Sequence, residues 1–328
     1  MTTRPVAPPV ALDRARELVD PLLVDAVARL NPALQLPVQH HLGGGGKHVR
    51  AALALVAAEA CGADVDSGLP AAVAIELVHN FSLVHDDVID GDRERRHRPT
   101  VWAQFGVGTA IITGDALVIL AMEVLLEHAN PFAARAAAEL ARATQAMTSG
   151  QADDMAFETR PIVSLEECLL MEERKTGALL SCASAMGAIL AGAPADTVQA
   201  LRDYGRHLGL AFQAVDDLLG IWGDPAVTGK PVGSDLRQHK KTLPVVAALA
   251  AADGMAGEFA ALLRGRLSER DVATAAQFVE GYGGRDAAME VAEHHLAEAL
   301  GALDRVPLVP RAAEELADIA SFVVGRDR

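Results

Sequence analysis

Residues 79–100 read HNFSLVHDDVIDGDRERRHRPT and place three aspartates at the end of an apolar segment, directly before a basic loop. The apolar spacing predicts a helix over about residues 69–91, so Asp86 and Asp90 share one face, about 6 Å apart along the axis, with Asp87 beside them. Like charges at this spacing repel each other at the negative end of the helix dipole. Mg²⁺ binds one or two carboxylates together with phosphate oxygens and would reverse that repulsion. Taken alone, the cluster could equally be a solvated acidic helix end.

A second acidic helix end follows later in the chain. Residues 212–224 read FQAVDDLLGIWGD, so Asp216 and Asp217 close another long apolar segment, with Asp224 beyond them. A basic loop follows each cluster, with Arg93, Arg95, Arg96 and Arg98 after the first and Lys230, Arg237, Lys240 and Lys241 after the second. Carboxylates surrounded by cations in this way predict a polyphosphate site bridged by metal ions.

A third candidate segment is HLGGGGKHVR, residues 41–50. Lys47 and Arg50 share one face near the start of a predicted helix, where free N–H groups and the dipole favour anions. The segment is not a nucleotide P-loop, because no Ser or Thr follows Lys47 and no strand precedes it. A flexible linker with solvated charges is the alternative interpretation.

The composition favours helices throughout. The 328 residues are 51% hydrophobic but only 4% aromatic, and Ala and Leu dominate, which suits helices better than strands. No segment alternates with period two for long enough to suggest a strand. We expect a helix over about residues 11–30, restarted by Pro21, and four or so helices after the polar loop that ends near residue 242. Further helices are expected over about residues 47–62, 106–127, 131–157, 165–190 and 195–221.

We therefore expect an all-α protein with a disordered lead-in over residues 1–9 and one helical domain over residues 10–328. A small subdomain after about residue 245 is the alternative. The formal charge of −15 argues against binding to nucleic acid or to anionic membranes in general.

Three further features of the sequence bear on location. Cys61, Cys168 and Cys182 have no CxxC spacing, so they predict neither a zinc site nor a disulfide framework. The first ten residues lack an apolar signal core, and no stretch of 18 apolar residues free of charge predicts a transmembrane segment. We expect a cytoplasmic protein.

Several motifs in order over about residues 40–250 resemble the trans-polyprenyl diphosphate synthases, the family that includes farnesyl and geranylgeranyl diphosphate synthases. GGGGKHVR resembles the family's Gly-Gly-Lys-x-x-Arg, and DDVID with the following RR and PT resembles its first aspartate-rich motif. GQADD, MEERKTG, FQAVDD and GKPVGSDLRQHKKT resemble the later motifs. The resemblance implies the isoprenoid synthase fold, a helical bundle around a central cavity, and a homodimer.

The resemblance also implies a role for each matching residue. Asp86 and Asp90, supported by Asp87, would hold two Mg²⁺ ions, and Asp216 would hold a third, with Asp217 and Asp235 in its water shell. Binding of the allylic diphosphate is implied for Arg95, Lys175, Lys230 and Lys240. Binding of isopentenyl diphosphate is implied for Lys47, Arg50, His79 and Arg96. Thr176 and Gln213 would lie near the reacting carbons, and Gln151 and Asp154 would support the pocket.

These roles agree with one reaction. Metals and cations stabilise the leaving diphosphate, so the allylic C–O bond can ionise. The double bond of isopentenyl diphosphate, held alongside, then attacks the cation. A proton is finally lost, and the released diphosphate is the expected acceptor.

The sequence departs from the family pattern at three positions. Gly220 replaces the third aspartate of the second motif, which puts the hold on the third metal in doubt while Asp216 is retained. His97 stands where a glycine is usual, and Ala51 where a proline is usual. Neither of these two changes removes a charged group.

Phe81 is the residue that we expect to set product length. It lies five residues before Asp86, about 7.5 Å back along the helix, and the small Ser82 follows it. This pattern, without an insertion in the first motif, resembles geranylgeranyl diphosphate synthases of the archaeal kind and predicts a C20 product. Farnesyl diphosphate is the second candidate product, and Phe81 as ordinary core is the structural alternative.

Two other functions are considered. A class I terpene cyclase would need no second basic site, whereas Lys47, Arg50 and Arg96 predict two diphosphates. A non-catalytic partner subunit would be expected to have lost its aspartates, which are all present here. For the homodimer, the apolar stretch over residues 110–126 is the candidate interface, although its apolar faces could be internal.

Overall fold

The computed structural model describes residues 8–225, 231–252, 257, 259 and 267–325, and these form a bundle of packed helices. The helices of the first half are α1 (Val10–Val27), α2 (Pro32–Leu42), α3 (Val49–Ala60), α4 (Val65–Ile89), α5 (Val101–Phe105), α6 (Val107–Leu126) and α7 (Ala133–Thr159). Those of the second half are α8 (Leu165–Glu172), η1 (Glu173–Gly177), α9 (Ala178–Leu190), α10 (Ala195–Trp222), α12 (Ser234–Arg237), α13 (Leu243–Ala251), α15 (Glu269–Gly281), α16 (Gly284–Leu303) and α17 (Pro310–Val324). The prediction of an all-α isoprenoid synthase fold is confirmed.

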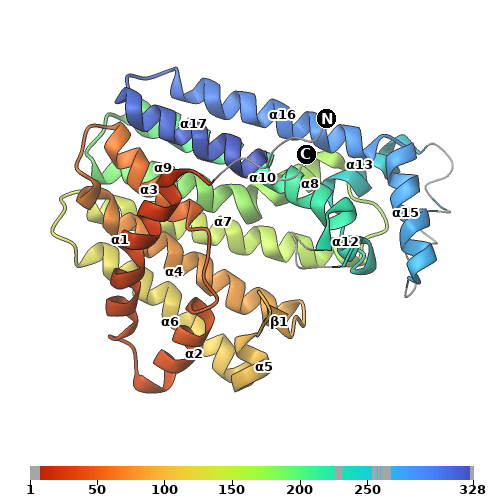
Figure 1. Ribbon diagram of the computed structural model, residues 1–328, viewed down its shortest axis with the longest axis horizontal. Helices are drawn as coiled ribbons and strands as arrows, with labels where there is room; N and C mark the ends of the chain where they lie inside the picture. Colours follow the sequence, from red (N-terminus) through yellow and green to blue (C-terminus); the bar gives the residue numbers. More distant parts are fainter. Residues whose placement is uncertain (1–7, 226–230, 253–256, 258, 260–266, 326–328) are drawn as a thin grey trace.

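Helix α9 lies at the centre of the bundle. Every residue from Leu179 to Leu190 is buried, as expected of a helix that is apolar on all sides. It packs against α3, α4, α7 and α10, while α16 and α17 cover α10 along one long side of the molecule (Figure 1). One apolar cluster takes in side chains from α1 through to α17, and a smaller one joins the end of α10 to α12, α13 and α15. The single-domain organisation stays a prediction.

Glycines allow the central helices to approach closely. A Cβ atom at Gly187 of α9 would overlap the carbonyl oxygen of Ala54 in α3, and one at Gly205 of α10 would lie 2.7 Å from the Cα of Ser181. The backbones are therefore too close for any larger residue. This close packing fixes α10 against α9 and so fixes the place of the second aspartate motif.

Several expected boundaries need correction. Helix α1 runs without a break through Pro21 and ends at Val27, because its buried apolar face continues on both sides of the proline. The expected helix over residues 165–190 is interrupted by the π-turn η1. Helix α2 was not predicted from the sequence. It contains Pro32 at its first position and Pro37 in its interior, and prolines usually indicate the end of a helix.

The loop after the first aspartate motif also forms a short hairpin that was not expected. Strands β1 (Glu94–Arg95) and β2 (Arg98–Pro99) pair antiparallel. The two residues between them, Arg96 and His97, have φ values of 52° and 60°. A two-residue turn with positive φ at both positions is the tight hairpin turn that favours glycine, which accounts for the glycine usual at position 97.

Helices α4 and α6 are long and apolar enough to span a membrane by length and composition alone. Most of the apolar window in α4 is buried inside the bundle, whereas less than half of that in α6 is. This pattern is what core and interface helices also give.

Candidate active site

The first aspartate motif closes helix α4 with three carboxylates in three different surroundings. Asp86 is half-buried in the last turn, and Asp90, which follows the helix, is exposed and donates its N–H to the carbonyl of Asp86 at 2.8 Å. Asp87 is 1% exposed and accepts a hydrogen bond from Nε of Arg95 at 2.8 Å. The two carboxylates that share one face are therefore Asp86 and Asp90, as the spacing predicted, while Asp87 anchors the basic hairpin.

Burial, together with the neighbouring carboxylate of Asp90, raises the pKa of Asp86 to about 6. The cations of Lys175, Arg95 and Lys240 oppose this shift. These three side chains come from η1, the hairpin and the loop after α12, so the fold brings separate basic segments around the first motif. The raised pKa shows that their charge does not fully offset the cost of an ionised carboxylate here.

The second motif divides its two aspartates between two surfaces of α10. Asp216 is exposed and lines the large cavity described below. Asp217 is 3% exposed, and its Oδ2 accepts the N–H of Leu243 at 2.8 Å, at the start of α13. The free N–H groups of a helix N-terminus stabilise a carboxylate in this position. Asp216 is thus the residue of this pair that faces the cavity.

A chain of hydrogen bonds runs from Asp217 to the candidate residues Gln213 and Thr176. Nε2 of Gln213 donates to Oδ1 of Asp217 at 2.7 Å, and the hydroxyl of Thr176 donates to Oε1 of Gln213 at 2.7 Å. Glu172 lies beside Asp217, and burial together with the facing carboxylate raises the pKa of Asp217. The chain fixes the orientation of the Gln213 amide.

The π-turn η1 positions Lys175 and Thr176 between two helices. A Cβ atom at Gly150 of α7 would lie 2.8 Å from the Cα of Lys175, and one at Gly209 of α10 would lie 2.5 Å from the Cα of Gly177. Both helices therefore pack directly on the backbone of the turn. Lys175 forms an ion pair with Asp154 of α7, so the expected supporting role of Asp154 has a contact behind it.

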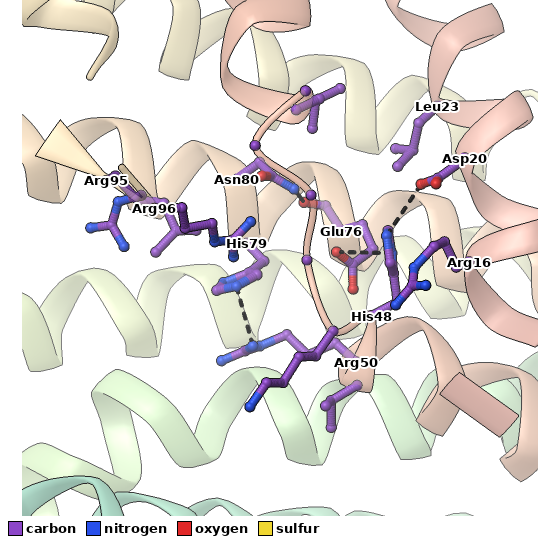
Figure 2. Close-up of a pocket in the computed structure, with 18 of the residues that line it drawn as sticks. Arg16, Asp20, Leu23, His48, Arg50, Glu76, His79, Asn80, Arg95 and Arg96 are labelled. Carbon is purple, nitrogen blue, oxygen red and sulfur yellow. Dashed lines mark hydrogen bonds and ion pairs between the residues drawn. The ribbon is translucent and has the colours of Figure 1, made fainter. Parts of the chain in front are cut away.

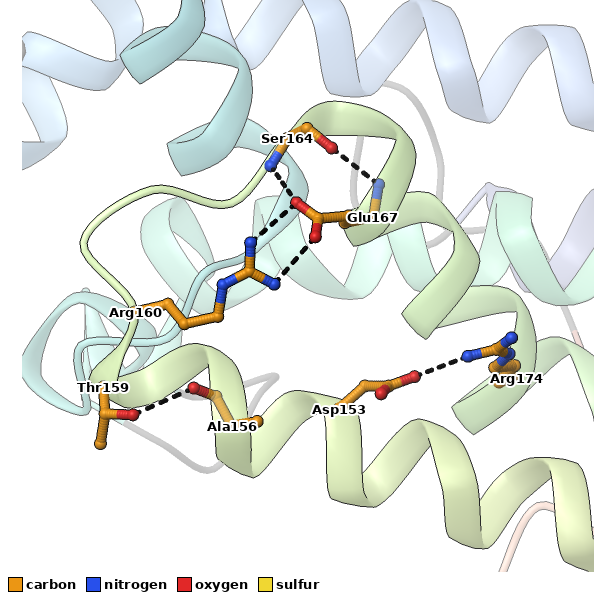
Figure 3. Close-up of polar contacts among 7 residues, drawn as sticks. All are labelled: Asp153, Ala156, Thr159, Arg160, Ser164, Glu167 and Arg174. Atoms are coloured by element: carbon orange, nitrogen blue, oxygen red, sulfur yellow. Dashed lines mark hydrogen bonds and ion pairs between the residues drawn. The ribbon is translucent and has the colours of Figure 1, made fainter.

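Further polar contacts connect the C-terminal part of α7 to η1 and to the start of α8 (Figure 3). Arg174 pairs with Asp153 at 2.9 Å, and Arg160 makes two hydrogen bonds to Glu167 at 2.8 and 3.1 Å. Glu167 also closes the capping box with Ser164 at the start of α8. These contacts fix the position at which α8 begins, and because η1 follows α8 directly, they also fix the position of η1.

The basic residues expected to bind a second diphosphate line one cavity of about 940 Å³ (Figure 2). Its lining includes the tetraglycine loop, the basic residues Lys47, Arg50, His79, Arg95 and Arg96, and also Asp216. The cavity thus joins the tetraglycine segment, the hairpin and the second aspartate motif. The three segments lie far apart in the sequence.

His79 is neutral in this cavity. Burial and the adjacent guanidinium groups of Arg50 and Arg96 hold its pKa well below the usual value. Nη1 of Arg50 donates to Nε2 of His79 at 3.3 Å, which places the histidine proton on Nδ1. His79 therefore presents a neutral N–H donor beside the cations.

The tetraglycine loop packs against the hairpin. A Cβ atom at Gly46 would lie 3.7 Å from Nη1 of Arg96, and one at Gly43 would lie 2.9 Å from Nη1 of Arg98. Small residues here allow the loop backbone to approach the guanidinium groups. Gly45, with φ of 70°, also has a conformation that other residues rarely adopt.

Sequence reasoning missed two residues that build this cavity, His48 and Glu76. Buried His48 adopts φ of 50° and contacts Asp20 of α1 at 3.2 Å and Glu76 of α4 at 3.7 Å (Figure 2). Glu76 is 5% exposed and accepts the N–H of Ala51 at 3.3 Å. Glu76 was recognisable in principle, because it is the one acidic residue in the apolar run AVAIELV.

The site residues fit magnesium bound jointly with phosphate. Within the described ranges, no three His, Cys, Asp or Glu side chains converge into a metal cage. Mg²⁺ does not need one, since it takes one or two carboxylates and completes its octahedron with water and substrate phosphates. The carboxylates of Asp86, Asp90 and Asp216 are donors of the required hard type. Lys230, also expected at the site, lies outside the described residues.

Position 220 has a structural explanation. A Cβ atom at Gly220 would overlap the carboxylate of Asp235, which comes from α12. The absence of a side chain on α10 therefore leaves room for a carboxylate from another helix. Oγ of Ser234 also donates to the carbonyl of Gly220 at 3.3 Å.

Comparisons with known proteins agree with this architecture. The sequence model of the polyprenyl synthetase family matches residues 31–279. The chain is 46% identical to the (2E,6E)-farnesyl diphosphate synthase of Mycobacterium tuberculosis, over 99% of this chain and 94% of that protein. It is 44% identical to the geranylgeranyl diphosphate synthase of the same organism, over 89% and 87% of the two chains.

The solved structure of a polyprenyl synthetase from Streptomyces coelicolor A3(2) superposes with a TM-score of 0.92 at 48% identity, covering 96% of this chain and 98% of that one. The geranylgeranyl pyrophosphate synthetase of Pyrococcus horikoshii superposes with a TM-score of 0.90 at 35% identity, covering 97% and 98%.

Proposed function

Because this chain belongs to the polyprenyl synthetase family and is a trans-prenyl diphosphate synthase, we propose that it condenses isopentenyl diphosphate with allylic diphosphates, using Mg²⁺, and that its main product is geranylgeranyl diphosphate. The feature that carries the C20 proposal is Phe81 followed by the small Ser82, five and four residues before Asp86. A single large side chain at this depth leaves more room than two would. Farnesyl diphosphate is the second candidate, since one relative at 46% identity is a farnesyl diphosphate synthase.

The residues divide into two diphosphate sites. Asp86, Asp90 and Asp216 would hold up to three Mg²⁺ ions, which as Lewis acids neutralise charge on the allylic diphosphate when bound. Asp87 and Asp217 support these sites through Arg95 and through Gln213. The second diphosphate site consists of the cavity residues Lys47, Arg50, His79 and Arg96.

The reaction follows from this arrangement. Arg95, Lys175 and Lys240 stabilise the diphosphate that leaves with the electron pair of the allylic C–O bond. The double bond of isopentenyl diphosphate then forms the new C–C bond to the allylic cation, next to the oriented oxygen atoms of Thr176 and Gln213. The proton lost from the product passes to the released diphosphate.

Helix α6 supports the proposal of a homodimer. Ile112, Ile119 and Leu126 are 56%, 60% and 59% exposed and recur every seven residues on its outer face. Such a stripe on a helix whose other face packs into the bundle is typical of a helix that pairs with a partner. A second copy of the chain would cover it.

The test is an incubation of the protein with isopentenyl diphosphate and each allylic starter, dimethylallyl, geranyl and farnesyl diphosphate, with Mg²⁺ or with a chelator. We expect C20 as the main product from all three starters and no product with the chelator. A protein that stops at C15 and does not extend farnesyl diphosphate would overturn the C20 proposal. Release of diphosphate from one substrate alone would instead indicate a cyclase.

The metal assignment has a matched control on the same helix. Replacing Asp86 by Asn should lower kcat/KM by about a hundredfold or more, since changes even to residues behind metal ligands cost about 10- to 100-fold. Replacing Asp66, an exposed aspartate in the first turn of α4, by Asn should leave kcat/KM unchanged. Equal activity in the two variants would contradict the assignment.

A further inference from the structure

The ring of Phe81 is in contact with a histidine from its own helix. Phe81 and His85 are one turn apart on α4, their ring centroids are 4.9 Å apart, and the rings are inclined at 71° in an edge-to-face arrangement. His85 therefore borders the residue on which the product-length proposal rests. It also directly precedes Asp86, so the two lie at one end of α4.

Helix α6 holds the other side of the His85 ring. Nε2 of His85 lies 3.0 Å from the carbonyl oxygen of Ile111, and because a carbonyl only accepts, Nε2 carries the proton and donates it. A second polar group of α6, Oδ1 of Asp115, lies 3.9 Å from the same nitrogen. These contacts tie the imidazole to the backbone of α6.

Gly114 makes this position of the ring possible. A Cβ atom at Gly114 would overlap Nε2 and Cδ2 of His85. The ring thus occupies the space that a side chain at position 114 would need. Gly114 is buried, which matches a role in helix packing rather than in a turn.

From this arrangement we propose that His85 is a positioning residue for product length: held by Ile111 and seated over Gly114, it fixes the ring of Phe81 and thereby limits the growth of the prenyl chain. The proposal rests on the proposed role of Phe81 in the synthase. Rotation of the Phe81 ring would change the depth available to an apolar chain. The edge contact with His85 restricts that rotation from one side.

The experiment measures the distribution of product lengths from farnesyl diphosphate and isopentenyl diphosphate in six forms of the full chain. The forms are the unchanged protein, the single variants Phe81→Ala, His85→Gln, Gly114→Ala and Gly108→Ala, and the double variant His85→Gln/Gly114→Ala. Gln at position 85 can still donate to the carbonyl of Ile111 but offers no ring edge to Phe81. Gly108 lies on the same helix as Gly114, and a Cβ atom there meets nothing within 4 Å.

We expect His85→Gln to raise the share of products longer than the main product by about tenfold, the order of discrimination that a single apolar pocket contact provides. Phe81→Ala should do the same or more. Gly114→Ala should alter the distribution, whereas Gly108→Ala should not. In the double variant His85→Gln/Gly114→Ala, the glycine change should add nothing, because its effect passes through the His85 ring.

The distribution separates the possible failures. If Phe81→Ala lengthens the products and His85→Gln does not, the positioning role of His85 is overturned while that of Phe81 stands. If neither lengthens them, both fall. Absence of any condensation in the unchanged protein would contradict the synthase itself, and a merely structural role for His85 would change the melting temperature and leave the distribution as it is.

Discussion

Gly220 is the residue at which the sequence departs from the family's second aspartate motif, and its neighbour in space is Asp235. The side chain of Asp235 reaches from α12 into the space that a residue at position 220 would need. A carboxylate from a different helix therefore lies where a side chain on α10 would lie. The second motif lacks its third aspartate, but a carboxylate is still present beside position 220.

This exchange predicts that restoring the motif harms the protein. Gly220→Asp should destabilise it by about 1–3 kcal/mol, the usual cost of overpacking a filled site, and should lower kcat/KM. The double variant Gly220→Asp/Asp235→Gly moves the carboxylate back to α10 and should recover stability and most of the activity. Thermal melting and initial rates measure both, and a Gly220→Asp variant that equals or exceeds the unchanged protein would refute the steric argument.

The π-turn η1 shows at the scale of the element how one turn is held for chemistry. Gly150 of α7 and Gly209 of α10 approach its backbone from two sides, and the turn presents Lys175 and Thr176. A π-turn places its side chains differently from an α-helical turn, and such turns recur at functional sites. The two glycines therefore allow α7 and α10 to pack directly on the backbone of η1 and fix its position.

A single methyl group on α7 tests this. Gly150→Ala should push on the backbone of Lys175, destabilise the protein by about 1–3 kcal/mol and raise the KM for the allylic substrate. The matched change Gly301→Ala, in α16, meets nothing within 4 Å and should be neutral or slightly stabilising, since Ala favours helices over Gly by about 0.5–1 kcal/mol. Denaturant unfolding and substrate titrations measure the two effects. Equal behaviour of the two variants would show that η1 tolerates displacement.

The elements differ in how well periodicity predicts them. Helices α4 and α10 are long and strongly apolar, so their ends, and hence both aspartate motifs, could be placed to within a few residues. The hairpin at residues 94–99 was not predicted, because its strands have two residues each, too few for an alternating pattern of apolar and polar residues. Helix α2 was not predicted because its prolines were interpreted as helix breaks, although Pro32 at the first position is typical of a helix start.

At the scale of the molecule, the outer face of α6 carries a row of exposed apolar side chains, Ile112, Ile119 and Leu126. The double variant Ile112→Glu/Ile119→Glu should convert the proposed dimer into a monomer, because each chain would have to bury two charges in the paired interface. Ile162→Glu, at a site that is 76% exposed after α7, is the control and should keep the dimer. Light scattering after size-exclusion chromatography gives the mass of each, and an unchanged mass in the double variant would place the interface elsewhere.

The sequence by itself determined the fold class through its composition and helical period. It indicated the reaction class and both aspartate motifs through an order of short motifs that resembles the trans-polyprenyl diphosphate synthases. Only the tertiary structure decided what each residue faces. It distinguished Asp216, which lines the cavity, from Asp217, which accepts a hydrogen bond from the backbone N–H at the start of α13. It brought Asp235 over Gly220 and His85 over Gly114. The physical reason is that such contacts join helices distant in the sequence, and their packing angle and depth follow from the whole core rather than from any segment of it.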